Sequence, residues 1–157
     1  MTDSAMRAKI WLTRTDGLTE EIEADYQVLE KMKSRVNAAV SKYENDGSNN
    51  RDVEAAKARH EDALLDYSSQ LDKIKGKELA LNQELKKTEE VINMIVYVKG
   101  GENLGATYRA IAKRRYIVGE KWYLIANKVH RSESQVYKDN LIILEIVSDI
   151  LAKHLIV

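Results

Sequence analysis

Apolar residues recur at alternating spacings of three and four through the first two thirds of the chain, the spacing that lines one face of a helix. The first series comprises Leu18, Ile22, Leu29, Met32, Val36, Ala39 and Tyr43. It predicts an amphipathic helix over about Thr19 to Glu44, with a gap in the apolar seam at Asp25 and Tyr26. The second series comprises Val53, His60, Leu64, Tyr67, Leu71, Ile74, Leu81, Leu85, Ile92 and Ile95. It predicts a helix over about Arg51 to Val98.

The segment between the two series, Asp46-Gly47-Ser48-Asn49-Asn50, contains only residues that favour turns. A turn this short between two long helices predicts an antiparallel coiled-coil hairpin. At about 1.5 Å per residue, the second helix would extend roughly 30 Å beyond the first. The exposed end contains Leu85, Ile92 and Ile95, so another element must bury it.

Several residues weaken the second seam. His60 and Thr88 occupy core positions, Glu78 stands where a Leu would be expected, and Gly76 lies in mid-helix. A glycine there costs up to about 1 kcal/mol relative to alanine. These residues predict a kink or a change of register near 76–78. We interpret His60 as a half-exposed seam histidine rather than a ligand.

Composition narrows the possible functions. Phe, Pro and Cys are absent, and 32% of the residues are charged, which favours long helices and excludes disulfides and thiolate chemistry. His60, His130 and His154 show no metal-ligand spacing. There is no pairing of a nucleophile with a base and no phosphate loop. We therefore expect that the chain is not an enzyme and binds neither a cofactor nor a metal ion. Without a secretory signal or a run of apolar residues that could span a bilayer, we expect a cytoplasmic protein with no membrane partner.

The net charge of zero is an average over unlike segments. Residues 1–98 contain 15 Lys or Arg against 19 Asp or Glu, residues 99–138 contain nine against three, and residues 139–157 contain one against three. A basic segment between two acidic ones predicts a localised surface for a polyanion.

The basic segment also has its own helical organisation. Gly100, Gly101 and Gly105 mark a boundary, so we expect an N-terminal segment at 1–17, the hairpin at 18–99 and a separate domain at 100–157. In that domain the apolar spacing predicts a helix over 104–117 with Gly119 as its stop, a short helix over 121–129 and a last helix over 133–155. Ser132 is placed to cap the last helix.

The last two predicted helices have the spacing of a helix-turn-helix. Trp122, Ile125, Ala126 and Val129 form the inner face of the short helix, and Val136 of the next helix faces back to them. Ala126 is small because the second helix crosses close to it. The exposed face of the second helix presents Glu133, Ser134, Gln135, Tyr137 and Lys138. These side chains can read base edges.

The run from Arg115 to Trp122, RYIVGEKW, is followed by Ile125-Ala126, Ser132 and Val136-Tyr137. This pattern resembles phage-encoded transcription regulators that have a domain like the fourth conserved region of bacterial sigma factors, relatives of the ArpU and RinA late-gene activators. Some members have a predicted helical hairpin before that domain, although the specific motifs here lie within residues 109–147. The resemblance implies that the DNA-facing residues include Lys128, Arg131, Ser134, Gln135 and Lys138. The full predicted DNA-binding set is Arg114, Arg115, Lys121, Lys128, Arg131, Ser132, Glu133, Ser134, Gln135, Tyr137 and Lys138.

The sequence departs from the family pattern at four positions. His130 replaces the usual turn glycine, so we expect a positive φ there. Asp139 stands where the pattern prefers a core Leu or Ile, and Leu141 and Ile142 replace common basic residues. Fewer basic residues predict a weaker nonspecific affinity for DNA and a shallower salt dependence. For Arg114 and Arg115, phosphate contact and a merely solvated face remain equal alternatives.

The last helix is apolar around most of its circumference and must therefore be buried. We expect it to pack on the free end of the long helix and on a second subunit, which gives a homodimer through the coiled coil and the C-terminal helix. The chain as a whole predicts an all-α, sequence-specific regulator of transcription for phage or mobile-element genes. It would bind double-stranded DNA, with host RNA polymerase as a further candidate partner. The alternatives are a small terminase subunit, whose usual domain order is the reverse, and a protein-binding helical adaptor.

Overall fold

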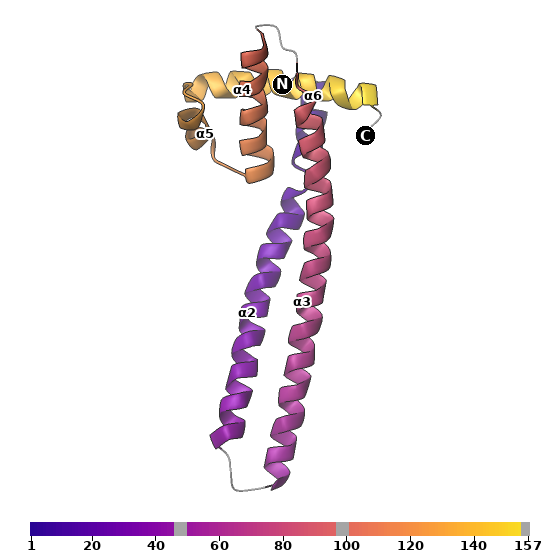
Figure 1. The fold of residues 1–157 in the computed structure, drawn as a ribbon, viewed down its shortest axis with the longest axis vertical. Helices are drawn as coiled ribbons and strands as arrows, with labels where there is room; N and C mark the ends of the chain where they lie inside the picture. Colours follow the sequence, from indigo (N-terminus) through magenta and orange to yellow (C-terminus); the bar gives the residue numbers. More distant parts are fainter. Residues whose placement is uncertain (46–49, 97–100, 155–157) are drawn as a thin grey trace. The chain divides into compact units, whose positions relative to one another are not determined.

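The structure is a computed structural model, and it describes residues 1–45, 50–96 and 101–154, with the side chains of 39–45 and 50–52 outside the description. The described residues form helices and no strands, as the all-α prediction requires (Figure 1). The elements are α1 (Asp3–Leu12), α2 (Asp16–Asn45), α3 (Asn50–Asn93), α4 (Glu102–Lys113), the π-helical turn η1 (Arg114–Val118), α5 (Trp122–Lys128) and α6 (Glu133–His154). Of the predicted turn at 46–50, residues 46–49 lie outside the described residues, and Asn50 begins α3. Gly100 and Leu155 also lie outside the described residues.

The long helices differ from their predicted bounds at the ends. α2 begins at Asp16, three residues before the predicted start, and α3 ends at Asn93 rather than at Val98. α3 also continues through Gly76 and Glu78 as one helix, so the helix is not broken at the position of the predicted kink or change of register. A Cβ atom at Gly76 would meet nothing within 4 Å, so no close contact requires a glycine there.

The helices form two compact units, one made of Met1–Thr15 with Asn82–Val157 and the other of Asp16–Leu81. The sequence predicted boundaries after residues 17 and 99. That division separates the N-terminal segment from the C-terminal domain and places the end of the long helix in the hairpin. The structure differs because the first 15 residues pack against the C-terminal part of the chain. The second unit is therefore inserted into the first along the sequence.

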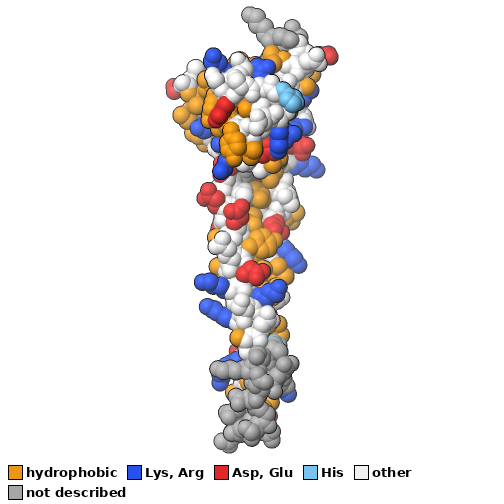
Figure 2. Space-filling model, turned by 90° about the vertical axis from the view of Figure 1, so that its left-hand side faces the viewer, with side chains coloured by type: hydrophobic (Ala, Val, Ile, Leu, Met, Phe, Trp, Pro, Cys, Tyr) orange, Lys and Arg blue, Asp and Glu red, His pale blue; other side chains and the backbone are white. Residues whose placement is uncertain are grey.

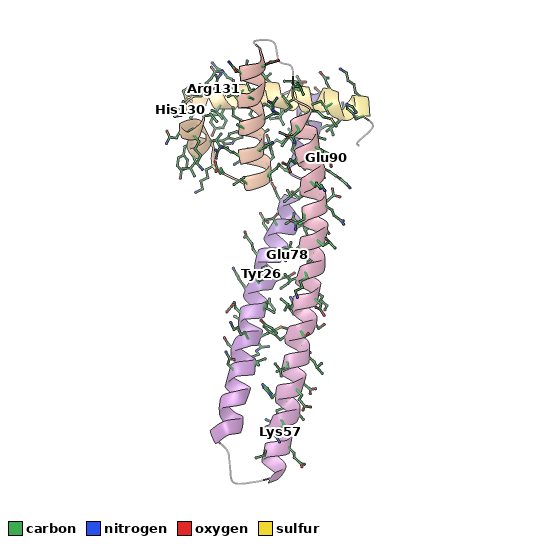
Figure 3. All side chains as sticks on the ribbon, viewed as in Figure 1. Tyr26, Lys57, Glu78, Glu90, His130 and Arg131 are labelled. Atoms are coloured by element: carbon green, nitrogen blue, oxygen red, sulfur yellow. The ribbon has the colours of Figure 1, made fainter. Side chains whose placement is uncertain are left out.

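In the unit of Asp16–Leu81, α2 and the first part of α3 lie side by side (Figure 1). Ile22, Leu29 and Ile74 form a small buried cluster between them. The gap predicted at Asp25 and Tyr26 is filled by polar contacts: Lys77 Nζ lies 2.6 Å from Asp25 Oδ2, and the Tyr26 hydroxyl donates to Glu78 (Figure 3). Glu78 therefore faces a hydrogen-bond donor on α2 where a coiled coil would place a leucine.

The other unit is built around α6, which crosses α4 (Figure 1). One face of α6 is buried, through Val136, Ile143, Leu144, Val147 and Leu151. The end of α3 joins the same core through Val91, Ile92 and Ile95. The expected packing of Ile92 and Ile95 with the last helix is thus observed.

The main cover of α6 is α1, a helix that was not predicted. Ala5, Ala8 and Leu12 lie on its inner face, each 1% exposed. Thr2 caps its first turn, since the Thr2 hydroxyl oxygen accepts a hydrogen bond from Ala5 N at 3.2 Å. Because α1 already covers α6, burial of this helix does not by itself require a second subunit.

Arg14 connects the end of α1 to α3. Its guanidinium lies 3.8 Å from the Trp11 ring centroid, and its Nε and Nη2 donate to the side chain and carbonyl of Glu84. Nη1 donates to the Thr88 hydroxyl at 3.1 Å. This contact explains a threonine at a core position of the long helix, because Thr88 is fully buried with both hydrogen-bonding functions in use.

No helix in the described ranges is both long enough and apolar enough to cross a membrane.

Candidate nucleic-acid interface

Of the five residues that the sequence predicted between α5 and α6, three are buried, and Trp122 and Val129 are partly buried. Ile125 and Val136 are fully buried and Ala126 is 5% exposed. A short turn joins the two helices, and Arg131 N donates to Ala126 O at 3.1 Å across it. His130 has a φ of 55°, which confirms the predicted positive value at this position (Figure 3).

Ser132 directly precedes α6 and caps it, as predicted. Gln135 N donates to the Ser132 hydroxyl oxygen at 3.1 Å, so the side chain satisfies one of the free amides at the helix start. While it accepts this bond, the Ser132 hydroxyl is directed to the start of α6 and not fully to solvent. Ser132 therefore acts first as a capping residue, and it lies next to the exposed side chains of Glu133 and Ser134.

The π-helical turn η1 was not predicted, and it sets the direction of the cations that precede α5. It ends at Gly119, whose φ of 81° is left-handed. Glu120 N then donates to Arg114 O at 2.9 Å and closes the turn. This local geometry brings Glu120 back over Arg114 and Arg115.

Glu120 contacts three of the predicted DNA-facing cations. Its Oε1 lies 2.6 Å from Lys128 Nζ and 3.3 Å from Arg114 Nη1, and its backbone carbonyl accepts from Arg115 Nη1 at 3.0 Å. The Lys128 hydrogen bond, helped by the charges of Lys128 and Arg114, holds the pKa of Glu120 below its usual range, although burial opposes this shift. Glu120 Oε2 is buried and has no hydrogen-bond partner among the described residues.

Arg115 also takes part in an aromatic stack. Its guanidinium carbon lies 4.7 Å from the Trp122 ring centroid, and the Trp122 and Tyr137 rings are 5.4 Å apart at an interplanar angle of 50°. Trp122 belongs to α5 and Tyr137 to α6. The stack therefore joins the π-helical turn to both helices.

Arg131 and Gln135 hold a buried carboxylate. Asp139 is 1% exposed, and its Oδ2 lies 2.6 Å from Arg131 Nε. Its Oδ1 accepts hydrogen bonds from Arg131 Nη2 at 3.1 Å and from Gln135 Nε2 at 2.9 Å. These two predicted DNA-facing side chains, of which Gln135 was expected to read bases, thus contact Asp139 on α6, and the buried Asp139 carboxylate has partners.

The remaining predicted residues are exposed. Lys138 and Lys121 have no ion-pair partner within the described parts of the chain, and the Tyr137 hydroxyl lies 3.4 Å from Glu133 Oε1. The exposed residues of the set are Lys121, Lys128, Ser132, Glu133, Ser134, Tyr137 and Lys138. Figure 2, viewed from the side of α5, shows Lys and Arg side chains among apolar ones over this part of the unit.

Sequence reasoning missed two residues that organise this surface, Glu120 and Asp139. The only available signal for Glu120 was its position between Arg114 and Lys128 in a basic segment. For Asp139 it was a carboxylate four residues after Gln135, which allows a contact on one helix face.

Within residues 1–45, 50–96 and 101–154, no group of three or more His, Asp or Glu side chains lies together so that it could hold a metal ion. Comparison of the chain with family models, with curated proteins and with solved structures finds no match.

Proposed function

We propose that the chain binds double-stranded DNA through α5 and α6, which act as a helix-turn-helix of the sigma-region-four kind, and that it regulates transcription of phage or mobile-element genes. The supporting observation is the packing of Ile125, Ala126 and Val136 around a left-handed turn at His130. This packing leaves one face at the start of α6 exposed and polar. A helix presented in this way fits the major groove.

The side chains on this surface divide into two roles. Ser134, Tyr137 and Lys138 at the exposed start of α6 would reach base edges. Lys121 and Lys128, with Arg114 and Arg115 behind them, would bind phosphates on the flank. Arg131 and Gln135 would contribute by keeping α6 in place through Asp139, rather than by reading bases.

We propose a different role for α2 and α3, which would form a coiled-coil hairpin for protein contacts. Exposed apolar side chains support this role, namely Tyr26, Val28, Leu64, Leu65 and Leu79.

We propose two partners for this hairpin. Contacts between two copies of it would give the homodimer, and host RNA polymerase is the other proposed partner. Sedimentation equilibrium tests the dimer: Leu64→Glu with Leu65→Glu should yield monomers, and a wild-type monomer at micromolar concentration would contradict it. The proposed location is the cytoplasm.

Selection of DNA from a random pool, with the full-length chain, tests the main proposal. We expect one enriched motif and a binding constant that falls with salt. The double variant Lys121→Ala and Lys128→Ala should bind all sequences more weakly, with a salt slope lower by about 1.8 if both contact phosphates. The matched control is Lys31→Ala with Lys33→Ala on α2, which makes the same change in charge. Recovery of no motif, or equal losses in both double variants, would contradict the proposal.

A further inference from the structure

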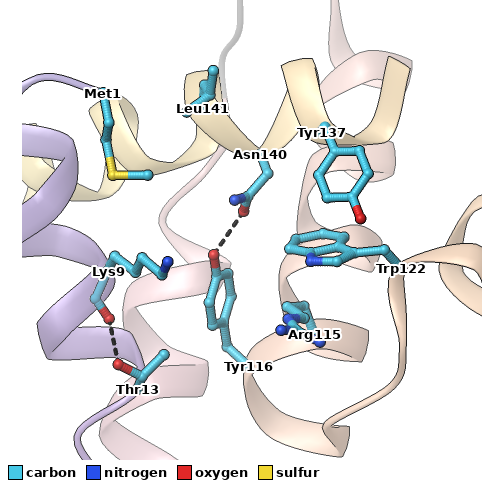
Figure 4. Close-up of a pocket in the computed structure, with 9 residues that line it drawn as sticks. All are labelled: Met1, Lys9, Thr13, Arg115, Tyr116, Trp122, Tyr137, Asn140 and Leu141. Carbon is cyan, nitrogen blue, oxygen red and sulfur yellow. Dashed lines mark hydrogen bonds between the residues drawn. The ribbon is translucent and has the colours of Figure 1, made fainter. Parts of the chain in front are cut away.

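A pocket of about 280 Å³ lies between α1, the π-helical turn and the helices α5 and α6 (Figure 4). Its volume is near the lower end of the range of about 300–1,000 Å³ that small-molecule sites occupy. The lining residues are Met1, Lys9, Thr13, Arg115, Tyr116, Trp122, Tyr137, Asn140 and Leu141. All of them belong to the unit of Met1–Thr15 and Asn82–Val157.

The charged residues that line the pocket are basic. Lys9 and Arg115 line it, and none of the described lining residues is acidic. The Lys9 ammonium has no ion-pair partner in the described ranges, and its side chain extends toward Tyr116 (Figure 4). An unpaired ammonium and a guanidinium that line the same pocket favour an anionic group there.

Hydrogen bonding fixes an amide at the inner wall. The Tyr116 hydroxyl donates to Asn140 Oδ1 at 2.7 Å, and both residues are buried. Burial raises the pKa of Tyr116, so its hydroxyl stays protonated and remains the donor at neutral pH. Because Asn140 Oδ1 is the acceptor in this pair, its Nδ2 remains as a donor (Figure 4). The pocket thus combines an amide donor with two cations.

Apart from Thr13, whose hydroxyl donates to Lys9 O at 2.9 Å, the rest of the wall is aromatic or apolar. Trp122 lies between Arg115 and Tyr137, with one ring contact at 5.4 Å and the guanidinium at 4.7 Å (Figure 4). Met1 and Leu141 supply the aliphatic part. Such a wall can pack against a flat aromatic ring in an offset or edge-to-face arrangement.

From these observations we infer a binding site for a small aromatic anion, a body of one or two fused rings that bears a carboxylate. The ring contacts the edge of Trp122 and the ring of Tyr137, since Arg115 covers one face of the indole, and the carboxylate lies within reach of Lys9 and Asn140 Nδ2. This site goes beyond the proposed DNA-binding function, and its existence does not depend on that function.

Titration of the full-length chain with 2-naphthoate tests the inference, with 2-naphthamide as the neutral probe of the same shape. We expect saturable binding of 2-naphthoate by calorimetry and weaker binding of the amide. Since Lys9 is exposed, Lys9→Gln should weaken 2-naphthoate binding by about two- to fivefold. Arg7→Gln is the matched control, because Arg7 lies on the same helix outside the pocket lining.

The two tryptophans of the chain locate the bound probe. In nitrogen-15 NMR spectra, 2-naphthoate should shift the indole N–H signal of Trp122 and leave that of Trp11 in place, with Trp122→Phe giving the assignment. Each of three results would overturn the inference: no saturable binding, equal binding of the two probes, or equal behaviour of the Lys9→Gln and Arg7→Gln variants.

Discussion

The Nε atom of Arg131 lies 2.6 Å from the Oδ2 atom of Asp139, a carboxylate with 1% of its surface exposed. The pair connects the end of the α5–α6 turn to the second turn of α6. Removal of Arg131 leaves a buried carboxylate with only Gln135 as a hydrogen-bond donor. Arg131 is therefore a poor choice for a variant that tests DNA contact alone.

We predict that Arg131→Ala lowers the free energy of unfolding by about 3 kcal/mol, the lower end of the effect of breaking a buried ion pair, because Arg131 is partly exposed. Lys138→Ala, next to Asp139 on α6, should change it by about 0.5 kcal/mol or less. Replacement of both partners, Arg131→Met with Asp139→Leu, should recover most of the loss. Urea unfolding measures all three. Equal stabilities of Arg131→Ala and Lys138→Ala would show that the ion pair does not stabilise the turn.

We predict that Glu120→Gln raises the affinity for DNA of random sequence and steepens its salt dependence. The charge that holds Lys128 and Arg114 is lost, so both cations become available to phosphates. Fluorescence anisotropy at several salt concentrations measures the effect. Glu90→Gln is the control, since it makes the same change in charge at an exposed site on α3. A gain of the same size in both variants would mean that net charge alone is responsible.

We predict that acid weakens the attachment of α1 to α6 through Glu145. Thr2 and Ser4 donate hydrogen bonds to this carboxylate, Ser4 at 2.7 Å, and they hold the pKa of Glu145 below its usual range. A depressed pKa in the folded state adds stability above the unfolded pKa, and that stability is lost as pH falls through the folded value. Urea midpoints measured from about pH 7 to about pH 3 should fall less steeply for Glu145→Gln than for the wild type. Parallel curves would exclude Glu145 as a source of the acid dependence.

We predict opposite effects for two glycine substitutions. Gly119→Ala should destabilise the chain by about 1–2 kcal/mol, because Gly119 has a φ of 81° that alanine rarely adopts. Gly76→Ala should stabilise α3 by about 0.5–1 kcal/mol, because Gly76 lies in mid-helix with open space around it. Thermal unfolding of both variants gives the signs. A stable Gly119→Ala protein would indicate that the π-helical turn can end in another conformation.

Some of these features could be predicted from the sequence because they depend on neighbouring residues. The Ser132 cap, the left-handed His130 and the packing of Ile125 against Val136 each involve residues within about three helical turns. The spacing of apolar residues was also sufficient to predict that the end of α3 needs a partner, and Ile92 indeed packs into the core with α6.

Other features depend on contacts that a single sequence does not reveal. α1 has two alanines and one leucine on its inner face, so its apolar pattern is weak although Thr2 is a good cap. Asp139 was interpreted as a departure from a core position because the fold of the turn that brings Arg131 to it is invisible in the sequence. The π-helical turn at Arg114–Val118 has no known spacing signal, and the position of Glu120 depends on it.

The hydrogen bond between Ser4 and Glu145 joins residues that are 141 positions apart. During synthesis, α1 therefore leaves the ribosome long before its packing partner exists, while α2 and α3 need only each other to begin folding. The unit with the candidate interface can close only after nearly the whole chain has been translated, a contact order that favours slow assembly.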